Sequence, residues 1–238
     1  MRRLALLVAL SGSPAAADPL PDGFVRLADL APGIAQDIRY ARAFNFTGAV
    51  VPGYQAAECI LTEQTARALI AVEARLAKDG YGLIVFDCYR PQRAVAHFVD
   101  WAGGAGGEEA GFFPGLARSD LIPMGYIAAR SSHARGVTVD AGLRRTGDPV
   151  DRPEVMPAPC DAPFDRRARE STLDLGTGFD CFSPLSGLGA DVGPAATANR
   201  ARLAAAMQAE GFIGYAAEWW HFRNAADPTR TRQDFVIR

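Results

Sequence analysis

The chain has 238 residues, 49% hydrophobic and 22% charged, a composition typical of a soluble globular protein with one sizeable core. Its formal net charge of −2 excludes the strongly basic surface with which proteins hold nucleic acids or anionic lipids. We therefore expect one domain and no nucleic-acid partner.

Residues 1–17 are typical of a Sec-type signal peptide. A short basic start is followed by an apolar run at 4–10, too short to span a bilayer, and by three alanines that end at Ala17. Cleavage after Ala17 would leave residues 18–238 as the mature domain. We expect this domain to be periplasmic or secreted, without stable insertion in a membrane.

The first half of the mature chain contains alternating strand and helix signals. Residues 37–40 predict a short strand, followed by a surface loop that reaches Tyr54. Thr62 can cap a helix that ends near Gly80. The next apolar run, at residues 83–86, has the length of a buried strand.

This predicted strand leads into a polar segment, Asp87–Arg90, and Pro91 then begins a helix. Stretches rich in glycine and proline at 103–107 and 153–159 predict loops within the domain. A last helix is expected at 199–210.

An aromatic segment at 215–222 should follow that helix and return to the sheet. Strands and helices mix without regular βαβ alternation. The sequence therefore predicts a single α+β domain whose mainly antiparallel central sheet is flanked by helices.

Export would place the four cysteines in an oxidising compartment, where disulfides are favoured over metal ligation. None lies in a CxxC motif, and three pairings are possible. We expect the pairs Cys59–Cys88 and Cys160–Cys181, because each closes a short loop. Four reduced, buried thiols are the alternative.

Two histidines lie in surroundings that favour metal chemistry. His133 precedes Asp140 by seven residues, with a turn and a β-branched run between them, and Glu218 precedes His221 by three. Two histidines and one carboxylate with an open position form a recurring catalytic zinc site. A hydrogen-bonded structural His–Asp pair and a packed core histidine at position 221 are the alternatives.

Several segments together match a known pattern. They are Asp37–Tyr40 with Asn45–Gly48, Asp87–Pro91, Ser131 with His133 and Asp140, Gly178–Asp180, and Glu218 with His221. In this order, from about residue 35 to 222, they resemble the zinc D-alanyl-D-alanine dipeptidases of the VanX type. That family is related to zinc D,D-carboxypeptidases and to the Hedgehog signalling domain, so the resemblance implies a fold of this type.

The resemblance implies one zinc ion per chain, bound by His133, Asp140 and His221. It also implies that Glu218 is the general base, acting on a metal-bound water that is the nucleophile. Zinc lowers the pKa of such a water to about 7, so a nearby carboxylate can take its proton. Glu218 and His221 would lie on opposite faces of an ideal strand, so we expect an irregular segment or approaches to the metal from different directions.

Arg90 would stabilise the developing oxyanion, since a guanidinium stays cationic and offers a rigid fork of donors. Asp87 could orient it, and a purely structural Arg90–Asp87 pair is the alternative. The resemblance also implies substrate contacts by Ser131 and Asp180, the latter to the free amino terminus. Both residue types are also common in structural turns.

The remaining histidine and the tryptophans have simpler interpretations. His97 matches no position of the family and is expected to be a surface or packing residue. Trp219 and Trp220 are expected to pack around the site, at least one of them as plain core.

The implied reaction is hydrolysis of D-Ala-D-Ala, a small D,D-dipeptide, to two D-alanines. Export favours salvage or turnover of peptidoglycan precursors over a role in glycopeptide resistance. The alternatives are a D,D-carboxypeptidase or endopeptidase acting on stem peptides, and a non-catalytic zinc-containing module that binds cell walls. Residues 147–172 depart from the family, which leaves the shape of the pocket open. The sequence does not indicate an oligomeric state.

Overall fold

The computed structural model describes residues 19–107 and 109–238, so the expected signal peptide at 1–17 lies outside the described residues. The strands are β1 (Phe24–Arg26), β2 (Ala35–Gln36), β3 (Ile60–Thr62), β4 (Tyr81–Asp87), β5 (Thr138–Arg145), β6 (Phe212–Tyr215) and β7 (Glu218–Asn224). The α-helices are α1 (Leu27–Leu30), α2 (Glu63–Ala77), α3 (Gln92–Ala102) and α4 (Gly193–Ala209). The 3₁₀ helices are η1 (Arg39–Ala41), η2 (Ala110–Phe112), η3 (Arg118–Asp120), η4 (His133–Arg135) and η5 (Pro184–Ser186).

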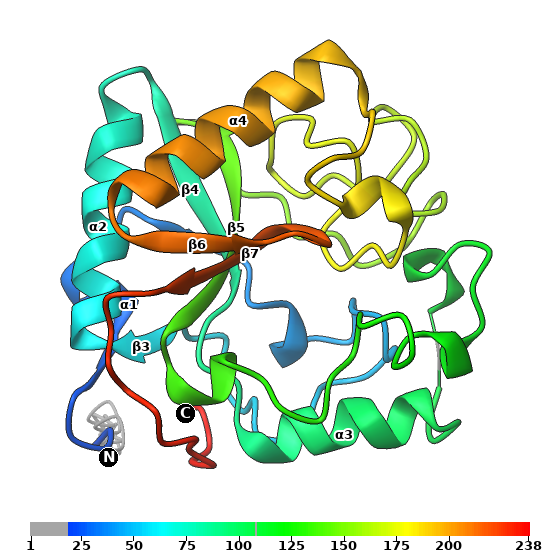
Figure 1. The fold of residues 1–238 in the computed structure, drawn as a ribbon, viewed down its shortest axis with the longest axis horizontal. Helices are drawn as coiled ribbons and strands as arrows, with labels where there is room; N and C mark the ends of the chain where they lie inside the picture. Colours follow the sequence, from blue (N-terminus) through cyan, green and yellow to red (C-terminus); the bar gives the residue numbers. More distant parts are fainter. Residues whose placement is uncertain (1–18, 108) are drawn as a thin grey trace, which may run out of the picture.

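A five-stranded sheet in the order β2-β4-β5-β7-β6 forms the centre of the structure (Figure 1). The short strand β2 pairs with β4 in parallel, and every other neighbouring pair in this sheet is antiparallel. Strands β1 and β3 form a separate antiparallel pair. The predicted α+β domain with a mainly antiparallel sheet is confirmed.

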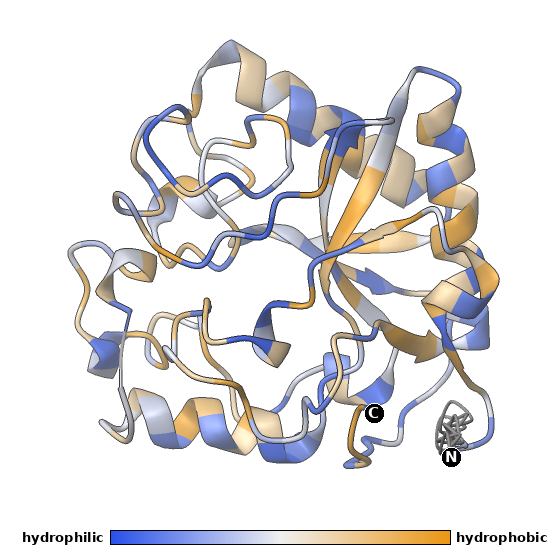
Figure 2. Cartoon of the chain, turned by 180° about the vertical axis from the view of Figure 1, so that it is seen from behind, coloured by the Kyte–Doolittle hydropathy of each residue, from blue (hydrophilic) through white to orange (hydrophobic). Residues whose placement is uncertain are grey.

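Two of the long helices cover the sheet. Helix α2 packs against β4, helix α4 packs against β5 and β6, and the two helices touch each other (Figure 1). Helix α3 lies apart from them, along the lower edge of the view in Figure 1. The apolar run Leu83–Phe86 of β4 is buried, and Figure 2 shows this hydrophobic character along the central strands.

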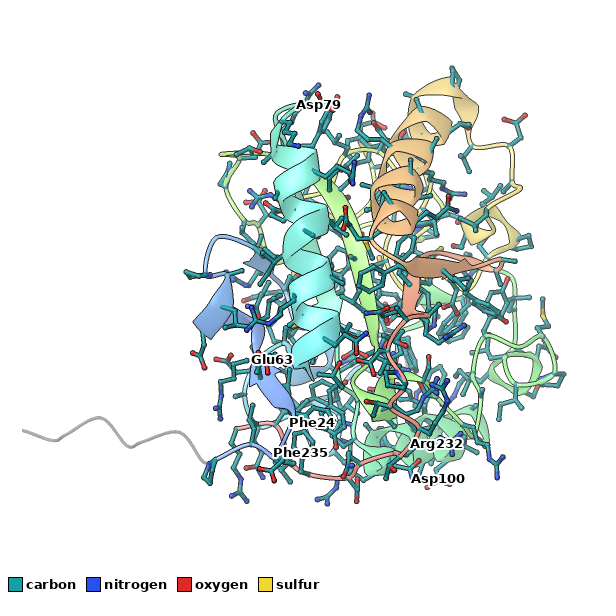
Figure 3. All side chains as sticks on the ribbon, turned by 60° about the vertical axis from the view of Figure 1, so that its left-hand side comes forward. Phe24, Glu63, Asp79, Asp100, Arg232 and Phe235 are labelled. Carbon is teal, nitrogen blue, oxygen red and sulfur yellow. A yellow bond between two sulfur atoms is a disulfide. The ribbon has the colours of Figure 1, made fainter. Side chains whose placement is uncertain are left out.

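Helix α2 begins and ends where the sequence predicts. The Thr62 hydroxyl caps it by accepting a hydrogen bond from the Thr65 backbone N–H at 3.2 Å. Beyond its last turn, Gly80 has a φ of +74°, a left-handed conformation that glycine adopts without a Cβ clash. In Figure 3, Glu63 marks the first residue of this helix and Asp79 lies just beyond its last turn.

The chain beyond β7 is attached to the start of α2 by one buried carboxylate. Asp227 accepts hydrogen bonds from the hydroxyl groups of Thr62 at 2.5 Å and Thr65 at 2.9 Å, and from the Thr229 backbone N–H at 2.9 Å. Burial alone would raise the pKa of Asp227, but these donors hold it below its ordinary value.

We expect Asp227→Ala to lower the free energy of unfolding at pH 7 by about 2 kcal/mol, because hydroxyl groups in the interior lose their acceptor. The folded pKa is lower than the unfolded value of about 3.9, so the carboxylate stabilises the fold fully above that pH. Its contribution disappears as the pH falls through the folded pKa. Urea unfolding of both proteins at pH 7 and at pH 3 measures this. Exposed Asp79→Ala is the control, and a difference that stays constant with pH would contradict the assignment.

The predicted strand at 37–40 is wrong. Strand β2 ends at Gln36, and the chain then turns into the 3₁₀ helix η1. The alternation of polar and apolar residues suggested a strand with one exposed face. Asp37 and Arg39 are instead buried, like their apolar neighbours, because they form an ion pair with each other at 2.7 Å. The loop that follows is a surface loop only in part, since residues 48–50 are exposed whereas Phe46 and Tyr54 are buried in the core.

The C-terminal elements differ from the prediction in their boundaries. Helix α4 begins at Gly193, six residues before the expected start, with a proline in its first turn, where the missing N–H costs nothing. The aromatic segment at 215–222 returns to the sheet as expected, where β6 and β7 form an antiparallel hairpin.

Both expected disulfides are present, Cys59–Cys88 and Cys160–Cys181, with Cα–Cα distances of 5.2 and 5.4 Å. The first disulfide connects the segments next to two strands. It joins the residue before β3 to the residue after β4.

The two ends of the described chain meet beside this disulfide. Phe24 and Phe235 lie together, with ring centroids 5.2 Å apart (Figure 3), and Phe235 stacks on Tyr89 at 4.0 Å. The C-terminal segment around Phe235 therefore packs against Tyr89, in the polar segment that follows β4. Among the described residues, no helix combines the length and apolar character needed to cross a bilayer.

Candidate active site and metal centre

Three neighbouring strands bring the polar residues of the site into one row. In the sheet register, Asp87 of β4 pairs with Asp140 of β5, and Asp140 pairs with His221 of β7. His133 reaches the same row from η4, just before β5 begins. Residues separated by up to 134 positions therefore meet because the central strands are antiparallel and in this register.

A bulge in the β6–β7 hairpin places Glu218 beside His221. Gly214 pairs with Phe222, whereas the next residue of β6, Tyr215, pairs with Glu218. The extra residues of β7 break the alternation of its side chains, so Glu218 and His221 line one pocket. This irregularity is one of the two arrangements that the sequence allowed.

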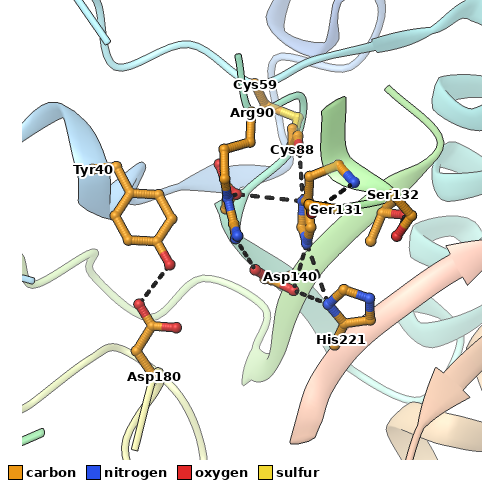
Figure 4. Close-up of polar contacts among 12 residues, drawn as sticks. Tyr40, Cys59, Cys88, Arg90, Ser131, Ser132, Asp140, Asp180 and His221 are labelled. Atoms are coloured by element: carbon orange, nitrogen blue, oxygen red, sulfur yellow. Dashed lines mark hydrogen bonds and ion pairs between the residues drawn. A yellow bond between two sulfur atoms is a disulfide. The ribbon is translucent and has the colours of Figure 1, made fainter. Parts of the chain in front are cut away.

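Three candidate ligand atoms converge at the centre of the row (Figure 4). His133 Nε2 and His221 Nδ1 lie 3.2 Å apart, and Asp140 Oδ1 lies 3.3 and 3.1 Å from them, respectively. The other nitrogen of His133, Nδ1, lies 2.7 Å from the Cys88 carbonyl oxygen. Donation of the Nδ1 proton to this carbonyl leaves the Nε2 lone pair facing the other two atoms.

This geometry fits zinc. Atoms bound at about 2.0–2.1 Å to a tetrahedral zinc ion lie about 3.3 Å from one another, which matches the three observed separations. Asp140 Oδ1 is buried and has no hydrogen-bond partner among the described residues, which a cation at this point would supply. A histidine pair with one carboxylate also has the donor chemistry that zinc accepts.

Arg90 is held rigidly beside Asp140. Its Nε donates to Asp87 at 2.8 Å, and its Nη2 lies 3.4 Å from Asp140. The guanidinium also lies against the rings of Tyr40 and Phe98, 5.1 Å from each centroid. Burial alone would lower the pKa of Arg90, but the surrounding acidic groups raise it well above its ordinary value, so the group stays cationic.

Asp87 orients this arginine, and is itself fixed by Tyr54, whose hydroxyl donates to it at 2.6 Å. We expect Asp87→Asn to lower kcat/KM by about 10- to 100-fold, because an amide nitrogen cannot accept one of these two bonds. Zinc content should stay nearly unchanged, since His133 Nδ1 lies closer to the Cys88 carbonyl oxygen, at 2.7 Å, than to Asp87 Oδ2, at 3.3 Å. Kinetics with metal analysis measures both. Asp100→Asn, on the exposed side of α3, is the control. Undiminished activity would show that Asp87 does not orient Arg90.

Glu218 is nearly buried at the start of β7, and one of its carboxylate oxygens lies 3.7 Å from His221 Nδ1. Burial, with the negative charge of Asp140 nearby, raises the pKa of Glu218 to about 8. Perturbed carboxyl groups of this kind can accept and return protons near neutral pH.

Asp180 lies across the pocket from the row of ligands. It has a φ of +57° and accepts a hydrogen bond from the Tyr40 hydroxyl at 2.8 Å (Figure 4). Burial, with the charge of Asp140, raises the pKa of Asp180 well above its ordinary value. A cationic group bound beside it would favour its ionised form. Tyr40 was not among the predicted site residues, although it lies in the first matched segment.

Ser131 also lines the pocket, and its Oγ accepts a hydrogen bond from the His133 backbone N–H at 3.2 Å. The arrangement is compatible with a substrate contact, and it also holds the turn that presents His133.

The pocket has a volume of about 290 Å³, which is small for a ligand site. The polar row forms one side of the pocket. Aromatic side chains also line it, among them Phe46, Phe98, Tyr126, Phe182 and Trp220. Among the described residues, none from 147–172 lines it. The segment that departs from the family therefore does not form the pocket wall.

The residues with simpler interpretations lie where expected. Trp219 is buried and donates from Nε1 to the Thr177 hydroxyl at 2.8 Å, whereas Trp220 lines the pocket. His97 is half-buried on α3 and is not among the clustered ligands.

Comparisons with known proteins find similar sequences over most of the chain. A family model described as "D-ala-D-ala dipeptidase" matches residues 21–236. A D-alanyl-D-alanine dipeptidase of Streptomyces coelicolor is 36% identical over 220 residues, which cover 90% of this chain and 98% of that protein. One of Enterococcus faecium is 32% identical over 203 residues, covering 84% and 90%.

A solved structure is also similar, that of the vancomycin resistance D,D-dipeptidase VanXYg in complex with a D-Ala-D-Ala phosphinate analogue. The match covers 75% of this chain and 56% of that one, with 18% sequence identity and a TM-score of 0.37. This likeness is too distant to support an argument about the site.

Proposed function

The chain belongs to the D-alanyl-D-alanine dipeptidase family, and from this premise we propose that it is a zinc-dependent enzyme that hydrolyses D-Ala-D-Ala to two molecules of D-alanine. One observation carries the proposal. The His133–Asp140–His221 cluster shares a single small pocket with a buried carboxylate, Glu218, and a fixed guanidinium, Arg90.

The residues divide the reaction between them. Zinc held by His133, Asp140 and His221 would supply Lewis-acid activation of water and of the peptide carbonyl. Glu218 takes a proton from the attacking water and returns it to the leaving amine. Arg90, which stays cationic, stabilises the charge that develops on the carbonyl oxygen.

Asp180 and Tyr40 are proposed to bind the free amino end of the substrate. An ammonium group against this buried carboxylate would form a charge-assisted hydrogen bond. A stem peptide or an acyl cap would instead place an uncharged amide there, with the rest of the peptide crowded in a small pocket. This contrast favours a dipeptidase over a carboxypeptidase.

The test is release of D-alanine from D-Ala-D-Ala and from N-acetyl-D-Ala-D-Ala by purified residues 18–238, with and without a chelator. We expect cleavage of the free dipeptide that the chelator abolishes and zinc restores. Preferred cleavage of the acetylated substrate would indicate a carboxypeptidase. Tight zinc binding without cleavage of either substrate would indicate a binding module.

We further propose that the protein is exported and serves salvage or turnover of peptidoglycan precursors. The apolar run at 4–10 and the alanines before Asp18 support export, and so do two disulfides, which persist in oxidising compartments. Fractionation of cells that express the full chain tests this. Active protein in the cytosolic fraction would contradict it.

A further inference from the structure

The segment at 147–172 contacts the loop that carries Asp180, on the side away from the pocket. Its Glu170 is buried and binds two elements at once. One carboxylate oxygen accepts from Arg39 Nη2 at 2.9 Å, and the other accepts from the Phe179 backbone N–H at 2.8 Å. Arg39 precedes Tyr40 in η1, and Phe179 precedes Asp180. Glu170 therefore connects the backbones that present the two members of the Tyr40–Asp180 pair.

A second attachment comes from Cys160 of the same segment. Its disulfide to Cys181 holds the residue after Asp180, and its carbonyl oxygen accepts from the Gly178 backbone N–H at 2.8 Å. Three of the residues that surround Asp180, at 178, 179 and 181, are thus each bonded to residue 160 or 170.

The backbone of Asp180 has an uncommon conformation. Its φ of +57° lies in the left-handed region, which residues other than glycine adopt seldom, although aspartate does so more readily than most, and fixed neighbours stabilise it. Arg39 on the other side is fully buried, paired with Asp37 at 2.7 Å, and packed against the rings of Phe44 and Phe86, 5.2 and 5.1 Å from their centroids. Glu170 therefore joins the loop that carries Asp180 to a buried, ion-paired part of the core.

We propose that Glu170, together with the Cys160–Cys181 disulfide, positions Asp180 and so determines the preference of the enzyme for substrates with a free amino group. This inference rests on the proposed function. Glu170 is a positioning residue, because neither it nor any other described residue of 147–172 lines the pocket. It acts on the substrate only through Asp180, and has no role in the proton transfers assigned to Glu218.

The first test is Glu170→Gln, an isosteric change that cannot accept both hydrogen bonds. The substrates are D-Ala-D-Ala and propanoyl-D-alanine, which lacks only the amino group. We expect KM for the dipeptide to rise about tenfold with little change in kcat, because an interaction made equally in the ground and transition states is weakened. Catalysis and competitive inhibition by propanoyl-D-alanine should not change. Glu154→Gln, an exposed residue of the same segment, is the control.

The second test is a double-mutant cycle with Asp180→Asn, read out as the affinity for a non-cleavable phosphinate analogue of D-Ala-D-Ala. If Glu170 acts through Asp180, the double variant should bind no more weakly than Asp180→Asn alone. Effects that multiply would overturn the proposal. Equal losses for dipeptide and propanoyl-D-alanine would also overturn it, since they would indicate a general structural role.

A third variant keeps the proposal testable if Glu170→Gln does not fold. The paired change Cys160→Ser with Cys181→Ser removes the other attachment and should produce the same selective rise in KM, with unchanged zinc content. Failure of the wild-type chain to cleave the free dipeptide would refute the proposed function itself. A wild-type dipeptidase whose variants keep their selectivity would refute only the positioning role.

Discussion

Glu218→Gln should lose about a thousandfold or more of its turnover while it keeps its zinc. The amide has nearly the shape of the carboxylate but cannot take a proton from water, and loss of a general base typically costs 10²- to 10⁴-fold, on the order of 3–5 kcal/mol in the barrier. Zinc should remain because Glu218 is not one of the converging ligands. Single-turnover kinetics on D-Ala-D-Ala, with metal content measured on the same sample, provide the test.

The stability of this variant should not decrease. Burial raises the pKa of Glu218, so the charged form is disfavoured in the fold, and the neutral amide removes that cost. A variant that is inactive, fully folded and loaded with zinc would therefore separate proton transfer from structure. Loss of zinc in parallel with activity would instead show that Glu218 is a ligand and that the roles are misassigned.

Much of the site could be predicted from the sequence because its chemistry is local. His133 and Asp140 flank one turn, with Gly136 at a φ of +70°, and the strand after it pairs as the β-branched residues predict. Glu218 and His221 lie in one short segment. The spacing within each pair could therefore be recognised in the sequence. Only the contact between the two pairs depends on the fold.

The sequence could not predict what depends on register and burial. The bulge that places Glu218 beside His221 arises from the pairing of β7 with β6, which the spacing of three residues does not specify. The strand expected at 37–40 failed because charged residues there are buried in an ion pair. Glu170 gave no signal at all, since its two partners lie 131 and nine residues away.

Loss of one metal ligand should have the other large effect. His133→Ala should not retain zinc through gel filtration, and its activity should fall by more than about a thousandfold, because two remaining ligands hold the ion far more weakly. His133 is buried, however, and its imidazole also binds the Cys88 carbonyl, so this variant should lose stability as well.

His221→Ala separates these two effects. The His221 side chain is 20% exposed, and its polar and ring contacts are with His133, Asp140, Glu218 and Tyr215, all of which line the pocket. Its removal should cost much less stability than removal of His133, with the same loss of zinc and activity. His97→Ala on α3, outside the ligand cluster, should keep both. Zinc binding that survives in His221→Ala would mean that β7 supplies no ligand, and the pairing of Asp140 with His221 across the sheet would then need another explanation.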